Sequence, residues 1–155
     1  MPNTNLFRDT DSVDLLKIKH LVQQFKSLKL PKAQWTHEAH IIVGTYNYLN
    51  FGFEGGLERM RKEIQRYNEA TGVKNSDTSG YHESITIFYM RMIATLVNEV
   101  VAGKLGLNSP ETEIYSHVLN SRLLDKTLLF EYYSKELIFS VTARRKWVPP
   151  DRKQV

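Results

Sequence analysis

Residues 81–102, YHESITIFYMRMIATLVNEVVA, decide the fold. The stretch contains neither proline nor glycine, and its apolar residues fall on almost every side of a helix of 3.6 residues per turn. A helix that is apolar nearly all round is normally buried at the centre of a domain. We therefore predict a central, buried helix over about residues 81–102.

Helical spacing of apolar residues and capping signals predict further helices on both sides of this stretch. They cover about 12–28 (capped by Asp11 or Ser12), 36–50 (capped by Thr36), 54–70, a segment that starts at Ser109–Pro110, 126–133 and 134–139, with a turn or helix at 141–145. Phe51–Gly52 predicts a turn. Because the period-two alternation of strands is absent, the sequence predicts an all-α fold: one domain over residues 1–155, a bundle of about five to seven helices, irregular at about 1–10 and 148–155.

Composition narrows the classes of protein. A chain of 155 residues with 41% hydrophobic and 25% charged residues is typical of one soluble globular domain. There is no cysteine, so any transition-metal site must use His, Asp and Glu. The first residues lack the apolar stretch of a signal peptide, and the longest uncharged run, 39–53, is too short to cross a bilayer. We expect a cytoplasmic protein without a membrane partner.

The net charge of +4 is confined to one end of the chain. Residues 144–153 hold five basic residues and one acid, while the remainder balances at sixteen of each sign. Binding to a phosphate backbone needs a contiguous basic surface. We therefore do not expect nucleic acid as a partner.

Residues 35–40, WTHEAH, place two histidines at the start of a predicted helix. His37 and His40 are three residues apart, so they share one helix face and can converge on one ion. His82 opens the predicted central helix and can add a third imidazole from a second element. Three protein nitrogens with an open position are typical of catalytic zinc, whereas two histidines and a carboxylate suit non-heme iron.

Glu83 follows His82 directly, and neighbouring helical residues point about 100° apart. If His82 is a ligand, Glu83 is the partner that orients a ligand or moves a proton, but the two roles can also be exchanged. Tyr81 and Glu83 are thus candidate catalytic residues beside the metal ligands His37, His40 and His82. Arg144 is a third candidate, because its guanidinium can hold a carboxylate or phosphate.

Three motifs, WTHEAH, GYHESIT and the closing ARRKWVPPD, resemble those of a family of small, largely uncharacterised bacterial proteins. That family carries W-T-H-x-A-H, then G-Y-H-E-[TS]-x-T, then a C-terminal Ala-Arg and Pro-Asp. Ser84 stands where the family more often has threonine. The resemblance implies a site but no substrate, and it singles out Trp35, Thr36, His37, Ala39, His40, Gly80, Tyr81, His82, Glu83, Thr86, Arg144, Pro150 and Asp151.

Two functions remain open at this point. The first is a small metal-dependent enzyme with zinc or iron at the three histidines. Its metal would activate water for hydrolysis or support oxygenase chemistry on a small molecule, anionic if Arg144 binds it. The alternative is a non-catalytic helical binding or interaction module, in which the histidines and glutamates join helix starts by hydrogen bonds.

Overall fold

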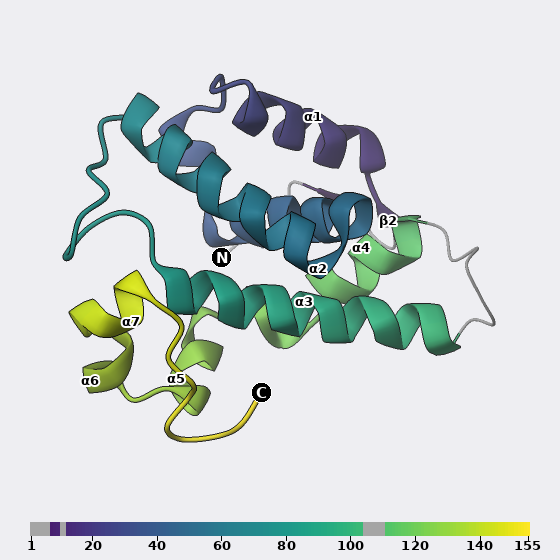
Figure 1. The fold of residues 1–155 in the computed structure, drawn as a ribbon. Coiled ribbons are helices and arrows are strands. Elements are labelled where there is room, and N and C mark those ends of the chain that lie inside the picture. The colour runs from purple at the N-terminus through teal and green to yellow at the C-terminus, as the bar shows by residue number, and fades with distance from the viewer. Residues whose placement is uncertain (1–6, 10–11, 104–110) are drawn as a thin grey trace.

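The structure is a computed structural model that describes residues 7–9, 12–103 and 111–155 (Figure 1). Within these ranges the elements are β1 (Arg8–Asp9), β2 (Ser12–Val13), α1 (Leu15–Lys26), η1 (Lys32–Gln34), α2 (His37–Ala70), α3 (Glu83–Gly103), α4 (Glu111–Leu119), η2 (Arg122–Leu124), η3 (Lys126–Leu128), α5 (Leu129–Tyr132), α6 (Lys135–Ile138) and α7 (Val141–Arg145), where η denotes a 3-10 helix. The predicted all-α bundle is confirmed, and β1 and β2 add only a short antiparallel pair. The predicted cap at Ser109–Pro110 lies outside the described residues.

Helix α3 is central, as the sequence predicts, but it is only partly buried, because Arg91, Thr95, Asn98 and Glu99 are exposed. It packs against α2, α4 and α7, and it crosses the molecule below α1 and α2 in Figure 1. Its buried residues include Ile87, Phe88, Met90 and Ile93, which join one continuous hydrophobic core. By length and composition alone this helix is also able to span a bilayer, a test that core helices of soluble proteins pass as well.

Helix α2 is a helical hairpin. Gly52 alone leaves the helical conformation, at φ 72° and ψ −172°, and the chain then folds back on itself. The side-chain amide of Asn47 donates to Glu63 Oε2 at 3.2 Å. A Cβ on Gly56 would lie 3.0 Å from the backbone carbonyl oxygen of Asn47. The two helices and the turn predicted for 36–70 are therefore present, joined at one glycine instead of a loop.

Helix α1 begins later than predicted. Asp14, not Asp11 or Ser12, is its N-cap, and the carboxylate accepts from the amides of Leu16 and Lys17 at 3.0 and 3.2 Å. Ser12 instead lies in β2. The cap prediction was wrong because local sequence offers three possible caps within four residues, Asp11, Ser12 and Asp14, and the pairing of β1 with β2 leaves the last of them to start the helix.

The C-terminal third is built from short helices that gather at the start of α3 (Figure 1). The Ser84 hydroxyl, fully buried in the first turn of α3, donates to the carbonyl of Lys146 at 2.8 Å and accepts from the amide of Val148 at 3.0 Å. The carboxylate of Asp151 accepts from the amide and hydroxyl of Ser134. Residues 148–155 are irregular, as predicted, yet hydrogen bonds hold them to the bundle.

Candidate functional site

The start of α2 positions His37 and His40 in its first turn. The hydroxyl of Thr36 caps the helix by accepting from the amide of Ala39 at 3.2 Å, which confirms the predicted cap. The indole of Trp35 stacks on the His40 ring with centroids 3.7 Å apart. The cap at Thr36 therefore fixes the helical turn that carries His37 and His40, and the stacking of Trp35 orients the His40 ring.

His37 is held by a carbonyl from a distant part of the chain. Its Nε2 lies 2.6 Å from the carbonyl oxygen of Leu123, in η2. A carbonyl can only accept, so Nε2 carries the proton, and the ring keeps a lone pair on Nδ1 when it is neutral. Burial lowers the pKa of His37 from 6.5, although the bond to Leu123 opposes the shift. The imidazole is neutral at pH 7 as a result.

His40 has the opposite tautomer. Its Nδ1 lies 2.7 Å from the carbonyl oxygen of Thr36, so Nδ1 donates and the lone pair is on Nε2. Burial lowers the pKa of His40 to about 4, so this ring is neutral as well. Within the described residues, neither lone pair is used by a protein hydrogen bond.

Both imidazoles line a cavity of about 280 Å³, hereafter the histidine cavity. Residues of both arms of the α2 hairpin, of α3 and of η3 line it. Its volume lies just below the usual range for ligand pockets. Its walls are mostly apolar, with five polar residues among them, and they consist of His37, His40, Ile41, Gly44, Met60, Ile64, Ile85, Thr86, Tyr89, Met90, Ile93 and Lys126.

His82 does not join the other two histidines at this cavity. Its Nε2 lies 2.6 Å from the carbonyl oxygen of Ile138, and its Nδ1 accepts from the amide of Ile85 at 3.2 Å. Both ring nitrogens are therefore occupied by backbone groups. The ring caps α3 and joins it to the end of α6, which is the role that the non-catalytic alternative assigns to it.

The three-histidine metal set is accordingly not assembled in this arrangement. No group of three or more His, Asp or Glu side chains within the described part of the chain is placed to hold a metal ion. His37 and His40 are the two predicted ligands that lie at one cavity. Because the carbonyl of Ile138 and the amide of Ile85 engage both ring nitrogens of His82, the three predicted ligands do not share one site.

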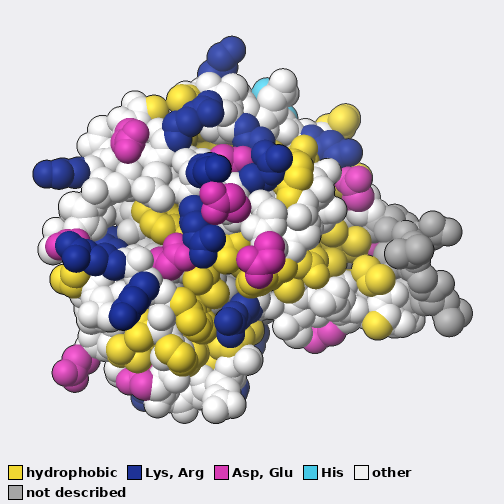
Figure 2. All heavy atoms as spheres, viewed as in Figure 1, with side chains coloured by type: hydrophobic (Ala, Val, Ile, Leu, Met, Phe, Trp, Pro, Cys, Tyr) yellow, Lys and Arg dark blue, Asp and Glu magenta, His cyan; other side chains and the backbone are white. Residues whose placement is uncertain are grey.

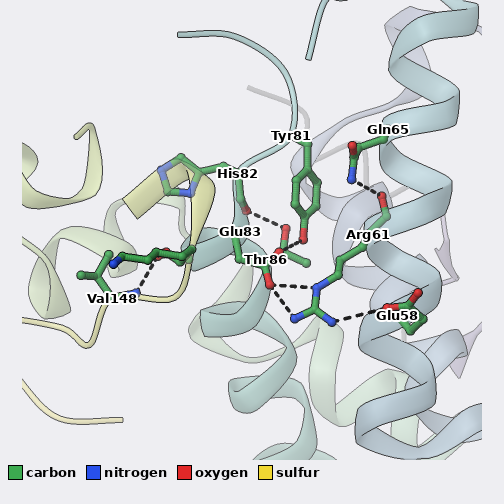
Figure 3. Close-up of polar contacts among 10 residues, drawn as sticks. Glu58, Arg61, Gln65, Tyr81, His82, Glu83, Thr86 and Val148 are labelled. Atoms are coloured by element: carbon green, nitrogen blue, oxygen red, sulfur yellow. Dashed lines mark hydrogen bonds and ion pairs between the residues drawn. The ribbon is translucent and has the colours of Figure 1, made fainter. Parts of the chain in front are cut away.

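Glu83 belongs to a second polar group, which Figure 3 shows between α3 and the second arm of α2. Its Oε1 accepts from Arg61 at 2.8 Å (Nε) and 2.5 Å (Nη2), and its Oε2 accepts from the hydroxyl of Tyr81 at 2.5 Å. Burial, and then the bond to Glu83, raise the pKa of Tyr81. Tyr81 therefore stays protonated and donates to a carboxylate that is already ion-paired.

Arg144 lies beside this group. One of its Nη atoms donates to the carbonyls of Gly80 and Tyr81 at 2.8 and 3.2 Å, which fixes the loop before α3. Tyr81, Glu83 and Arg144 line a separate cavity of about 340 Å³ with Arg61. The three predicted catalytic residues therefore lie together, but at a different cavity from His37 and His40.

Three residues that sequence reasoning did not assign to a site complete these two cavities. Arg61 is on the charged face of a predicted helix, where no local signal separates it from solvated neighbours. Lys126 and Tyr89 line the histidine cavity from η3 and α3. Burial, followed by the nearby charge of Asp125, raises the pKa of Tyr89 to about 12, so its hydroxyl is a hydrogen-bond donor at pH 7.

Charged side chains on the viewed face of the molecule are of both signs. Figure 2 shows Lys and Arg interspersed with Asp and Glu, with apolar side chains exposed between them. A mixed surface of this kind is typical of a solvated face.

Comparisons of the chain with profiles of known protein families, with functionally characterised proteins and with solved structures gave no significant match.

Proposed function

We propose that the protein binds a small, mainly apolar molecule in the histidine cavity, and that His37 or His40 accepts a hydrogen bond from a hydroxyl or amine of that molecule. One observation carries the proposal: two neutral imidazoles with opposite tautomers line one mostly apolar cavity, and each has a lone pair that no hydrogen bond within the described residues uses. A ligand with an apolar body and one donor group would contact the apolar walls and donate to one of the two ring nitrogens.

The same arrangement supports proton transfer once such a ligand is bound. An imidazole that is neutral at pH 7 and hydrogen-bonded to a ligand hydroxyl is a general base by position and protonation state. The backbone carbonyls of Leu123 and Thr36 hold the two rings in place for this role. We propose binding as the primary activity and base chemistry as the reaction class that it allows.

A metal-dependent enzyme is the second candidate. The lone pairs of His37 and His40 at one cavity favour it, since imidazole nitrogens are common metal ligands. Catalytic zinc normally has three protein ligands, and His82 does not supply the third in this arrangement. The experiment below separates the two candidates.

The test compares benzyl alcohol with benzyl methyl ether, which keeps the ring but lacks the donor. We expect benzyl alcohol to bind roughly fivefold to tenfold more tightly, the worth of one hydrogen bond in a desolvated site. Imidazole ¹⁵N spectra of the wild type should show lone pairs on Nδ1 of His37 and Nε2 of His40, and benzyl alcohol should shift those two signals. The double variant His37→Phe/His40→Phe should abolish the preference, while His20→Phe at an exposed position should keep it.

Equal binding of the two probes by the wild type, or ring signals of the opposite tautomers, would overturn the proposal. The ¹⁵N measurement needs no variant, so it remains decisive if a substitution impairs folding. A titration with Zn²⁺ in place of the alcohol tests the second candidate. Stoichiometric shifts of the same two ring nitrogens by Zn²⁺, with no response to benzyl alcohol, would favour a metal site.

A further inference from the structure

Lys126 gives the histidine cavity a cationic side chain. It is the first residue of η3, which Asp125 caps through the amide and hydroxyl of Thr127 at 2.9 and 2.7 Å. Lys126 lines the cavity together with both histidines. None of the ion pairs within the described residues involves it. The cap by Asp125 therefore fixes the backbone at Lys126, whose side chain lines the cavity.

The charge of Lys126 reaches both imidazoles. Burial is the largest cause that lowers the pKa of His37 and of His40; the backbone hydrogen bond of each ring raises it, and the charge of Lys126 lowers it. Asp125 acts on His37 in the opposite direction, but its carboxylate already accepts from Thr127 and is not part of the cavity wall. The charge of Lys126 therefore acts on both of the rings that line this cavity.

The hydroxyl of Tyr89 is a second donor on the same wall. The Tyr89 ring meets the His37 ring edge-on with centroids 5.1 Å apart, so the phenol and the imidazole are neighbours. No hydrogen bond within the described residues uses the Tyr89 hydroxyl, and the phenol is protonated at pH 7 because its pKa is about 12. Two donors, Lys126 and Tyr89, therefore accompany two acceptors, His37 and His40.

We propose that the ligand of the histidine cavity is a small 2-hydroxy carboxylic acid with an apolar side chain. Its carboxylate is bound by Lys126 and the Tyr89 hydroxyl, and its hydroxyl donates to His37 or His40. The apolar side chain occupies the wall of α2 and α3 residues, which includes Ile41, Ile64 and Ile93. This assignment rests on the proposed function above. It adds that the ligand has a carboxylate, and that Lys126 binds this carboxylate instead of Arg144.

The probes are mandelate, as both enantiomers, and the two molecules that lack one of its groups: benzyl alcohol without the carboxylate and phenylacetate without the hydroxyl. Titrations of the full chain should give a dissociation constant for the better mandelate enantiomer roughly fivefold to tenfold below that of either partial probe at low salt. Lys126→Met should bring mandelate and benzyl alcohol within about twofold of each other. The double variant His37→Phe/His40→Phe should instead remove the advantage of mandelate over phenylacetate.

The matched control is Lys135→Met, which removes an exposed lysine of α6 that is not part of the cavity wall. It should leave all three constants unchanged. The assignment of the carboxylate to Lys126 would be overturned if mandelate bound no better than benzyl alcohol, or if the advantage of mandelate survived Lys126→Met. The proposed function would still hold in that case if the protein preferred benzyl alcohol over its methyl ether. Loss of that preference would instead remove the proposed function itself.

Discussion

Backbone carbonyls set the tautomer of each histidine at the two helix starts. Leu123, Thr36 and Ile138 each place a carbonyl oxygen 2.6 to 2.7 Å from one ring nitrogen of His37, His40 and His82 respectively. Because a carbonyl only accepts, each bond protonates one nitrogen and defines the other. At His82 an amide takes the second nitrogen, whereas at His37 and His40 no hydrogen bond within the described residues uses it. Three histidines at helix starts thus differ in whether the second ring nitrogen is already hydrogen-bonded to the protein.

His40 should make the stability of the protein fall on acidification. Its pKa is about 4 in the folded chain and 6.5 in the unfolded chain, so the unfolded state binds more protons between these values. The free energy of unfolding should therefore decrease as the pH falls from about 6.5 to 4, by on the order of 2 to 3 kcal/mol from this group. Urea unfolding of wild type and His40→Phe at pH 7.0 and 4.5 measures the difference.

The variant should lose this part of the pH dependence, since its aromatic ring keeps the contact with Trp35 but does not titrate. His20→Phe, at an exposed position, should retain the wild-type slope. Equal slopes in wild type and His40→Phe would mean that His40 is not buried in neutral form.

At the scale of elements, the hairpin of α2 creates the space for both cavities. The second arm returns along the first, so Met60 and Ile64 face the same cavity as His37 and His40. Arg61, on the same arm, reaches Glu83 at the start of α3 (Figure 3). One glycine therefore determines which side chains of α2 meet α3.

Gly52→Ala should destabilise the protein by about 2 kcal/mol. The combination of φ 72° and ψ −172° is accessible almost only to glycine. A side chain there is strained even though, among the described residues outside its own stretch of helix, no heavy atom would lie within 4 Å of its Cβ. Chemical unfolding gives the magnitude. Gly103→Ala, at the end of α3 with equally open surroundings, should be neutral or stabilising by up to about 1 kcal/mol. Similar losses in the two variants would exclude a conformational role for Gly52.

At the scale of the whole molecule, the C-terminal segment closes the end of the bundle where α3 begins. The amide of Arg152 donates to the carbonyl of Tyr132 at 2.9 Å, and the hydroxyl of Tyr133 donates to the carbonyl of Val148 at 2.6 Å. Together with the bonds of Ser84, these contacts join residues that are far apart in sequence. The start of α3, and with it His82 and Glu83, is therefore placed by the last residues of the chain.

Ser84→Ala should cost about 1 to 3 kcal/mol, because it leaves the carbonyl of Lys146 and the amide of Val148 without their buried partner. Hydrogen exchange should also become faster for the amide of Val148. Ser27→Ala, at an exposed serine that bonds only the carbonyl of Gln24, should be nearly neutral. A Ser84→Ala protein as stable as the wild type, with unchanged exchange at Val148, would contradict this account of the C-terminal segment.

The helices and the first-turn position of His37 and His40 follow from local sequence, because capping by Thr36 and the spacing of apolar residues act within a few residues. The bundle, the central helix and the turn at Gly52 could be predicted for the same reason. Local sequence does not contain the partners of the site residues. Leu123, Ile138 and Arg61 contact His37, His82 and Glu83 across 86, 56 and 22 residues. Tertiary packing alone therefore separated the six candidates into two cavities and a helix cap, since hydrogen bonds over such separations depend on how the helices pack.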